Sequence, residues 1–126
     1  MRRILVVDDE PDIRLVAKLA LERIGGHEVV EADGADAAVA AVADRPPDLV
    51  LLDVMMPGTD GPATLARLRQ QPSGADLSVV FLTAKVQRSE RERLGALGVA
   101  GVIPKPFDPM TLATELAQLL GWEDET

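Results

Sequence analysis

The chain has 126 residues, 13 of them basic and 21 acidic, which gives a net charge of −8 at pH 7. This length fits one domain with a single core. The acidic balance argues against direct nucleic-acid binding, and two Phe and one Trp are too few for a base-stacking surface. There is no cysteine and only one histidine, His27, which excludes disulfides, thiolate sites and His-rich metal sites.

No apolar run approaches the length of a membrane span, and the N-terminus lacks the apolar region of a secretory signal. We therefore expect no membrane insertion. Together with the absence of cysteine, the pattern predicts a domain of a reducing compartment, the cytoplasm. Its chemistry must come from carboxylates, hydroxyls and lysines.

Short apolar runs alternate with amphipathic stretches five times, beginning with a predicted strand at 4–7. A helix then opens at Pro11 and ends at a glycine pair. The second strand, over 27–31, leads into an alanine-rich helix over 34–43, for which Asp33 is the predicted N-cap.

The third predicted strand covers 48–52, and the helix after it begins near Pro62. A fourth strand over 78–82 is followed by a largely charged helix over 87–97, and the fifth strand covers 99–103. Three of the five runs are continuously apolar and β-branched, as in strands that are buried on both faces.

The last helix has the clearest start, with Asp108 as the predicted N-cap and Pro109 in the first turn. Strict alternation of strands and helices predicts parallel strands joined by right-handed crossovers, with helices on both faces of the sheet. In such sheets the functional site lies beyond the carboxyl ends of the strands.

Polar residues stand at four of these strand ends. They are Asp8 and Asp9 after the first strand, Asp53 after the third, Thr83 after the fourth and Lys105 after the fifth. Each alone has an ordinary explanation as a turn residue, an N-cap or a solvated side chain. Together they are significant, because the predicted fold brings all five to one edge of the sheet.

The grouped residue types point to phosphoryl chemistry. Three carboxylates at one edge repel each other, which raises their pKa values or requires a cation, and a hard divalent ion such as Mg²⁺ suits oxygen ligands. A lysine and a hydroxyl beside them supply a positive charge and a hydrogen-bond donor for a phosphoryl group. The set predicts phosphoryl transfer onto an aspartate.

Four segments carry these residues: Ile-Leu-Val-Val-Asp-Asp at 4–9, Asp-Leu-Val-Leu-Leu-Asp-Val-Met-Met-Pro-Gly-Thr-Asp-Gly at 48–61, Leu-Thr-Ala at 82–84 and Pro-Lys-Pro-Phe at 104–107. In this order and spacing they resemble the receiver domain of bacterial two-component response regulators, chemotaxis regulators among them. The resemblance implies a receiver domain over 1–121 and a short polar tail over 122–126. It also implies a flavodoxin-like α/β fold: a doubly wound, five-stranded parallel sheet in strand order 2-1-3-4-5, flanked by five helices.

The resemblance implies that Asp53 is the phospho-acceptor, which takes its phosphoryl group from a sensor histidine kinase or a phosphotransfer protein. It makes Asp9, Asp53 and the backbone carbonyl of Met55 direct ligands of Mg²⁺ or Mn²⁺, while Asp8 acts mainly through metal-bound water. The domain is then a phosphoprotein and signalling acceptor, and the only reactions it catalyses are its own phosphotransfer and autodephosphorylation.

Further roles follow from the same resemblance. Lys105 pairs with the phosphoryl oxygens, Thr83 hydrogen-bonds one of them, and the Lys105–Pro106 peptide bond is cis. The fourth helix, fifth strand and fifth helix form the surface that signals to a downstream protein. Met55 and Lys85 occupy positions that tune the phosphoryl lifetime in the family, although each is also consistent with an ordinary surface side chain.

The chain departs from the family pattern three residues before the lysine, where many receivers carry an aromatic residue that follows the threonine. Here the residue is Val102, whose branched side chain has no ring to swing inward. Residues 100–101 are Ala-Gly where some DNA-binding subfamilies carry acidic residues for dimer salt bridges. The sequence therefore gives less support for the coupling between the threonine and an aromatic residue. It also gives less support for phosphorylation-driven dimerisation through those salt bridges.

Three other functions are less consistent with the sequence. A Mg²⁺-dependent phosphatase would usually carry a second Asp two residues after the nucleophile, where this chain has Met55. A flavin-binding module would need a hydroxyl- and Gly-rich loop after the first strand, where acidic residues 8–10 would repel phosphate. A degenerate receiver that only docks partners would not need the intact acidic set. We expect either a stand-alone receiver or the N-terminal part of a longer regulator.

Overall fold

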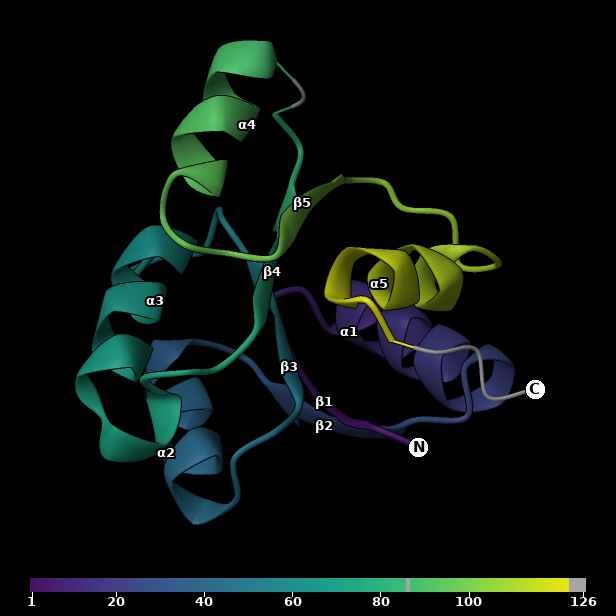
Figure 1. Ribbon diagram of the computed structural model, residues 1–126, viewed down its shortest axis with the longest axis horizontal. Helices are drawn as coiled ribbons and strands as arrows, with labels where there is room; N and C mark the ends of the chain where they lie inside the picture. The colour runs from purple at the N-terminus through teal and green to yellow at the C-terminus, as the bar shows by residue number, and fades with distance from the viewer. Residues whose placement is uncertain (86, 123–126) are drawn as a thin grey trace.

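The computed structural model describes residues 1–85 and 87–122. In this part of the chain five strands alternate with five α-helices (Figure 1): β1 (Arg3–Val7), α1 (Pro11–Leu19), β2 (Glu28–Ala32), α2 (Ala35–Asp44), β3 (Leu49–Asp53), α3 (Gly61–Gln70), β4 (Val79–Thr83), α4 (Arg88–Gly95), β5 (Gly101–Pro104) and α5 (Leu112–Leu120). A π-helical turn, η1 (Ala20–Ile24), extends α1, and a 3₁₀ turn, η2 (Pro72–Gly74), follows α3.

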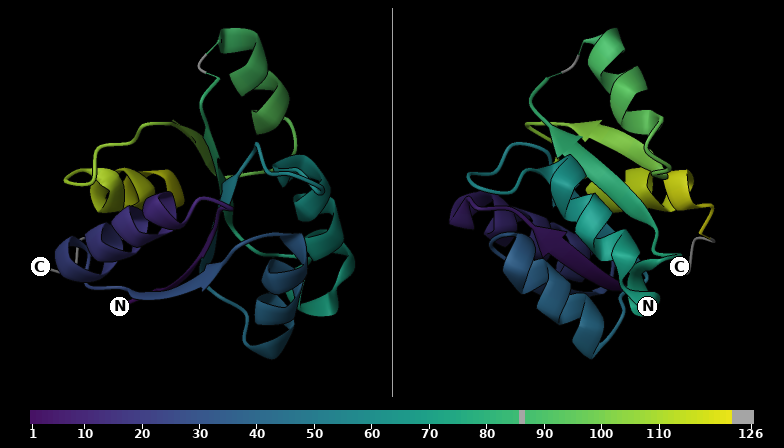
Figure 2. Two further views of the ribbon diagram at one scale, coloured as in Figure 1. Left: turned by 180° about the vertical axis from the view of Figure 1, so that it is seen from behind. Right: turned by 90° about the vertical axis from the view of Figure 1, so that its left-hand side faces the viewer.

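The strands form one parallel sheet in the order β2-β1-β3-β4-β5. Helices α1 and α5 cover one face of the sheet, while α2, α3 and α4 lie on the other (Figures 1 and 2). The predicted doubly wound fold and its strand order are confirmed. Because all strands run the same way, their carboxyl ends form one edge, called the carboxyl edge below.

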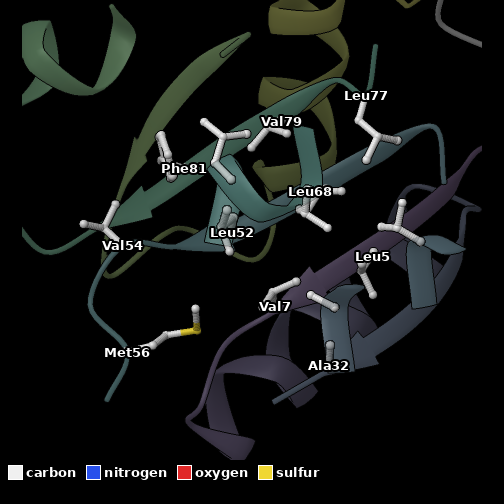
Figure 3. Packing of buried hydrophobic residues seen from close by; sticks show 14 of the residues in the cluster. Leu5, Val7, Ala32, Leu52, Val54, Met56, Leu68, Leu77, Val79 and Phe81 are labelled. Atoms are coloured by element: carbon white, nitrogen blue, oxygen red, sulfur yellow. The ribbon is translucent and has the colours of Figure 1, made fainter. Parts of the chain in front are cut away.

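Side chains of the central strands β1, β3 and β4 alternate between the two faces of the sheet. Those facing α2, α3 and α4 are Leu5, Val7, Val50, Leu52, Val79 and Phe81 (Figure 3). Those facing α1 and α5 are Ile4, Val6, Leu49, Leu51, Val80 and Leu82. All twelve are buried, so both faces require apolar residues and the strands read as continuous apolar runs.

Two predicted N-caps are wrong. Helix α2 begins after a glycine with no side-chain cap, one residue beyond Asp33. Helix α5 begins one turn later than predicted, with Thr111 at the N-cap position. The Asp108 carboxylate instead accepts a hydrogen bond from the Met110 amide at 2.9 Å, which closes a turn ahead of the helix. An aspartate before a helix suits either arrangement, so its local propensity does not decide between them.

Packing continues to the end of the described chain. The ring of Trp122 packs against the core on the α1/α5 face, with its centroid 5.6 Å from that of His27 and 5.0 Å from the Arg2 guanidinium. The rest of the predicted tail, 123–126, lies outside the described residues. Across residues 1–85 and 87–122, no helix has both the length and the apolar character needed to cross a bilayer.

The close approach of η2 to α3 gives a test of this packing. A Cβ on Gly74 would lie 1.9 Å from the backbone carbonyl oxygen of Leu68. We expect Gly74→Ala to lower the free energy of unfolding by about 2 kcal/mol or more, because backbone atoms must move to admit the methyl group. Urea unfolding measures this. The control is Gly95→Ala in α4, where a Cβ meets nothing within 4 Å and stability should be unchanged or slightly higher. Equal stabilities of the two variants would contradict the packing.

Candidate functional site

The predicted site residues meet at the carboxyl edge. Asp53 and Thr83 are the last residues of β3 and β4, Asp8 follows β1 directly, and Lys105 follows β5 directly. Three of these polar residues are buried: Asp8, Asp53 and Thr83. We call Asp8, Asp9, Asp53, Thr83 and Lys105 the acidic site.

Lys105 connects the two sides of the acidic site. Its ammonium lies 2.8 Å from Asp8 Oδ2 and 3.2 Å from Asp53 Oδ1. Its backbone amide donates to the Thr83 carbonyl at 2.8 Å, which extends the β4–β5 pairing past the end of the strands. The Lys105–Pro106 peptide bond is cis, as the family resemblance implies. One cation therefore serves two buried carboxylates that arrive from different strands.

Burial and the neighbouring charges shift the pKa values of both Asp53 and Lys105. Burial, reinforced by the neighbouring Asp8 charge, raises the pKa of Asp53 from 3.8 to about 6, although Lys105 and the Met55 amide act against this. For Lys105, burial alone would lower the pKa. The hydrogen bond to Asp8 and the charges of Asp53 and Asp8 outweigh burial, so the pKa of the ammonium is raised. Lys105 thus stays charged, and Asp53 is ionised at neutral pH.

Besides Asp8 Oδ2, which contacts the Lys105 ammonium, two buried carboxylate oxygens in the acidic site, Asp9 Oδ1 and Asp53 Oδ2, have no hydrogen-bond partner within the described part of the chain. Leaving buried anionic oxygens unsatisfied is costly. Carboxylate oxygens of Asp8, Asp9 and Glu10 also lie within 4.8 Å of one another. Orphaned oxygens among clustered carboxylates fit a hard divalent cation such as Mg²⁺, which takes oxygen ligands.

The structure gives the contacts of Met55 and Thr83 but does not test their predicted roles. The Met55 amide donates to Asp53 Oδ1 at 3.3 Å and its side chain is 59% exposed, while metal ligation by its carbonyl stays a prediction. The Thr83 hydroxyl accepts a hydrogen bond from the Lys85 amide at 3.1 Å. Its bond to a phosphoryl oxygen stays a prediction, as does lifetime tuning by Met55 and Lys85.

Three residues that shape the site were not among the predicted metal-binding or phosphoryl-binding residues. Glu10 joins the carboxylate cluster, and its position directly after the aspartate pair was a usable signal. Arg14 donates to the Asp8 carbonyl at 2.7 Å, which no pattern in the sequence indicates. Gly61 lets α3 approach β3, because a Cβ there would lie 2.5 Å from the Asp53 carbonyl oxygen.

The raised pKa of Asp53 predicts a pH dependence of stability in the metal-free protein. Between pH 3.8 and about 6 the folded protein holds a proton that the unfolded chain has lost, so stability falls as pH rises through this window. Relative to Asp53→Asn, which cannot titrate, the wild type should lose on the order of 2–3 kcal/mol of unfolding free energy. Urea unfolding in chelator measures this, and parallel pH curves for the two proteins would contradict it.

Comparison with known proteins assigns the family. A family model of the response regulator receiver domain matches residues 4–117. The phosphate regulon transcriptional regulatory protein PhoB of Pseudomonas aeruginosa is 39% identical over 119 residues, which cover 94% of this chain and 52% of that protein. The transcriptional regulatory protein ResD of Bacillus subtilis is 36% identical over 124 residues, covering 98% and 50%. The chain therefore spans about half the length of these curated relatives.

Solved structures agree with this assignment. The chemotaxis response regulator CheY4 of Vibrio cholerae superposes with a TM-score of 0.86 at 28% identity, covering 94% of this chain and 98% of that one. The N-terminal domain of a response regulator receiver protein from Methanoculleus marisnigri has a TM-score of 0.76 at 37% identity, with coverages of 95% and 97%. The chain belongs to the receiver domain family of two-component response regulators.

Proposed function

We propose that this domain is a phosphorylation switch in which Asp53 accepts a phosphoryl group from a phosphohistidine of a sensor histidine kinase or a phosphotransfer protein. The observation that carries this proposal is the Lys105 ammonium, 3.2 Å from Asp53 Oδ1 and 2.8 Å from Asp8 Oδ2. It lies beside the buried Asp53 Oδ2, which has no hydrogen-bond partner among the described residues. A positioned cation next to an available carboxylate oxygen suits phosphoryl transfer.

In this reaction a carboxylate oxygen of Asp53 attacks phosphorus and forms the new O–P bond. The P–N bond to the donor imidazole breaks, and its electron pair stays on the departing nitrogen. Lys105 neutralises charge on the phosphoryl oxygens, and Thr83 donates its hydroxyl hydrogen to one of them. With the pKa of Asp53 at about 6, the attacking carboxylate is ionised at neutral pH.

Mg²⁺ or Mn²⁺ is the cofactor of this proposal. Asp8, Asp9, Asp53 and the Met55 carbonyl would hold the ion, with Asp8 acting through bound water. When bound, the ion supplies charge neutralisation at the phosphoryl oxygens. The orphaned oxygens of Asp9 and Asp53 support this ligand set.

Two other functions fit the site less well. A phosphatase acting on external substrates would need a proton donor near Met55, whose exposed thioether has no proton to give. A flavin phosphate would meet the clustered carboxylates of Asp8, Asp9 and Glu10. We therefore propose a signalling acceptor and no turnover of external substrates.

The proposed output surface is α4, β5 and α5, which signals to a downstream protein. Leu94 is the one buried side chain of α4 in the described chain, and the exposed side of this helix carries the pairs Arg88–Glu92 and Glu90–Arg93. Val102 packs against the same core cluster as Leu94 and has no ring to follow Thr83. We propose that α4 and the segment before it report phosphorylation, because sparse anchoring allows movement.

This proposal includes neither direct nucleic-acid contact nor membrane insertion by the domain. It places the domain in the cytoplasm, as expected for a bacterial response regulator. The transcriptional roles in the names of PhoB and ResD belong to proteins about twice as long.

The acceptor is tested by intact-mass spectrometry. With Mg²⁺ and acetyl phosphate the protein should gain about 80 Da, which is one phosphoryl group. Asp53→Asn should abolish the gain and Asp8→Asn should reduce it, whereas Asp44→Asn, at an exposed position on α2, should behave as wild type. Normal labelling of Asp53→Asn in a brief, low-donor reaction would show that another residue accepts the phosphoryl group.

The metal site is tested by thermal melts with and without Mg²⁺. At ten times its dissociation constant, the ion should stabilise the wild type by about 1.4 kcal/mol, which is roughly 4 °C or more for a domain of this size. Asp9→Asn should lose most of this response. The control is Asp12→Asn, at an exposed position in α1, which should keep the response. Equal shifts in Asp9→Asn and wild type would place the ion elsewhere.

The output surface is tested by backbone NMR with and without beryllofluoride, a phosphoryl mimic. We expect shift changes from residue 87 through β5, because the mimic should recruit Thr83 and Lys105 at the ends of β4 and β5. Changes confined to residues that contact the mimic, with 87–103 unmoved, would refute this route.

A further inference from the structure

Glu10 lies on the solvent-exposed side of the acidic site. Its backbone amide donates to Asp8 Oδ1 at 2.9 Å, which holds the residue against the site at the start of α1. Its Oε1 lies 3.9 Å from Lys105 Nζ. The side chain is 61% exposed, compared with 0% for Asp8 and 2% for Asp53. The Glu10 carboxylate is thus held near the lysine but faces solvent.

The charge balance around Lys105 is strongly negative. The ammonium lies within 4 Å of carboxylate oxygens from Asp8, Asp53 and Glu10. The Asp9 carboxylate clusters with those of Asp8 and Glu10, which adds a fourth carboxylate to the site. The Arg14 guanidinium also lies nearby, but it bonds the Asp8 backbone carbonyl and pairs with Glu31 rather than with these carboxylates. Charges a few ångströms apart interact appreciably even near solvent, and they are screened only beyond roughly 8 Å at physiological salt.

A phosphodonor reaching Asp53 is itself an anion and must approach through this field. The buried carboxylates of Asp8 and Asp53 are partly neutralised by direct contact with Lys105. Glu10 is only loosely paired with the same ammonium, so more of its charge acts on an incoming anion. It also competes with the donor's oxygens for that ammonium.

We propose that Glu10 is a specificity-determining residue, a charge gate that disfavours small, doubly charged phosphodonors at Asp53. A phosphohistidine on a docked protein overcomes the same repulsion with binding energy from its interface, which a small donor lacks. This inference rests on the proposed phospho-acceptor function of Asp53. It adds that the acidic site discriminates between donors by their charge and by their ability to dock.

The test compares two small donors on Glu10→Gln, which removes the charge and keeps the shape. Acetyl phosphate carries two negative charges at neutral pH and releases acetate when its P–O bond to the acetyl group breaks. Phosphoramidate carries about one net negative charge and releases ammonia when its P–N bond breaks. Initial rates of mass gain are measured at saturating Mg²⁺, at low and at high salt.

We expect Glu10→Gln to speed labelling by acetyl phosphate roughly three- to tenfold at low salt. The gain should be smaller with phosphoramidate and should shrink at high salt, because screening weakens the field. Asp12→Asn, which removes an exposed negative charge two residues away, should stay within about twofold of wild type, and Glu10→Asp should keep the gate. Thermal melts verify that each variant is folded.

Three results would overturn the proposal. Equal acetyl phosphate rates for Glu10→Gln and Asp12→Asn would show that Glu10 has no special effect. A gain that is independent of donor charge and salt would show that the effect is not electrostatic. Weaker Mg²⁺ binding by Glu10→Gln in calorimetry, with slower labelling by both donors, would make Glu10 a metal-site residue instead. Failure of the phospho-acceptor function itself is distinguishable, since either wild type would gain no mass with either donor or Asp53→Asn would gain mass as wild type does.

Discussion

The structure of the functional site depends on the Lys105 ammonium, which is held between the buried carboxylates of Asp8 and Asp53. Removing one partner from a buried ionic group leaves an uncompensated charge, which costs several times more than losing an exposed salt bridge. The compensation here is incomplete, because one cation serves several carboxylates and, besides Asp8 Oδ2, two buried oxygens in the described chain have no hydrogen-bond partner. The raised pKa of Asp53 has the same origin. A site with excess negative charge has affinity for cations and resists anions, and both properties follow from a single charge imbalance.

The backbone pairing of the sheet fixes the positions of the charged residues in the acidic site. Backbone hydrogen bonds continue the strand pairing past the ends of the strands, from the Asp8 amide to the Ala32 carbonyl and from the Lys105 amide to the Thr83 carbonyl. The site residues therefore leave the sheet in directions determined by pairing with buried neighbours. By contrast, α4 has one buried side chain within the described chain and a charged exterior. Rigid positioning of the proposed acceptor, Asp53, next to a weakly anchored helix is the arrangement that a local charge change needs to produce a response at a distance.

Exposure separates the roles of the acidic residues. Asp8 and Asp53 are buried and contact Lys105 directly, so their charges interact mainly with the ammonium and are shielded from solvent. Glu10 lies 3.9 Å from the same ammonium but is mostly solvated, so its charge acts outward on approaching ions. The buried carboxylates of Asp8 and Asp53 therefore form the proposed metal and phosphoryl site, while the exposed carboxylate of Glu10 acts on the ions that approach it.

The residue pattern alone predicts the alternation of strands and helices, the parallel sheet and the gathering of Asp8, Asp53, Thr83 and Lys105 at one edge. Continuous apolar runs require two covered faces, and parallel strands must end on the same side. Strand order came from family resemblance, since the pattern of one strand does not specify its neighbours. The folded structure was needed to show that Asp33 and Asp108 are not N-caps, because an aspartate near a helix start can equally close a turn. It alone placed Glu10 beside Lys105 and showed that Asp53 Oδ2 has no hydrogen-bond partner among the described residues, because these features depend on distances between atoms far apart in the chain, which no local pattern encodes.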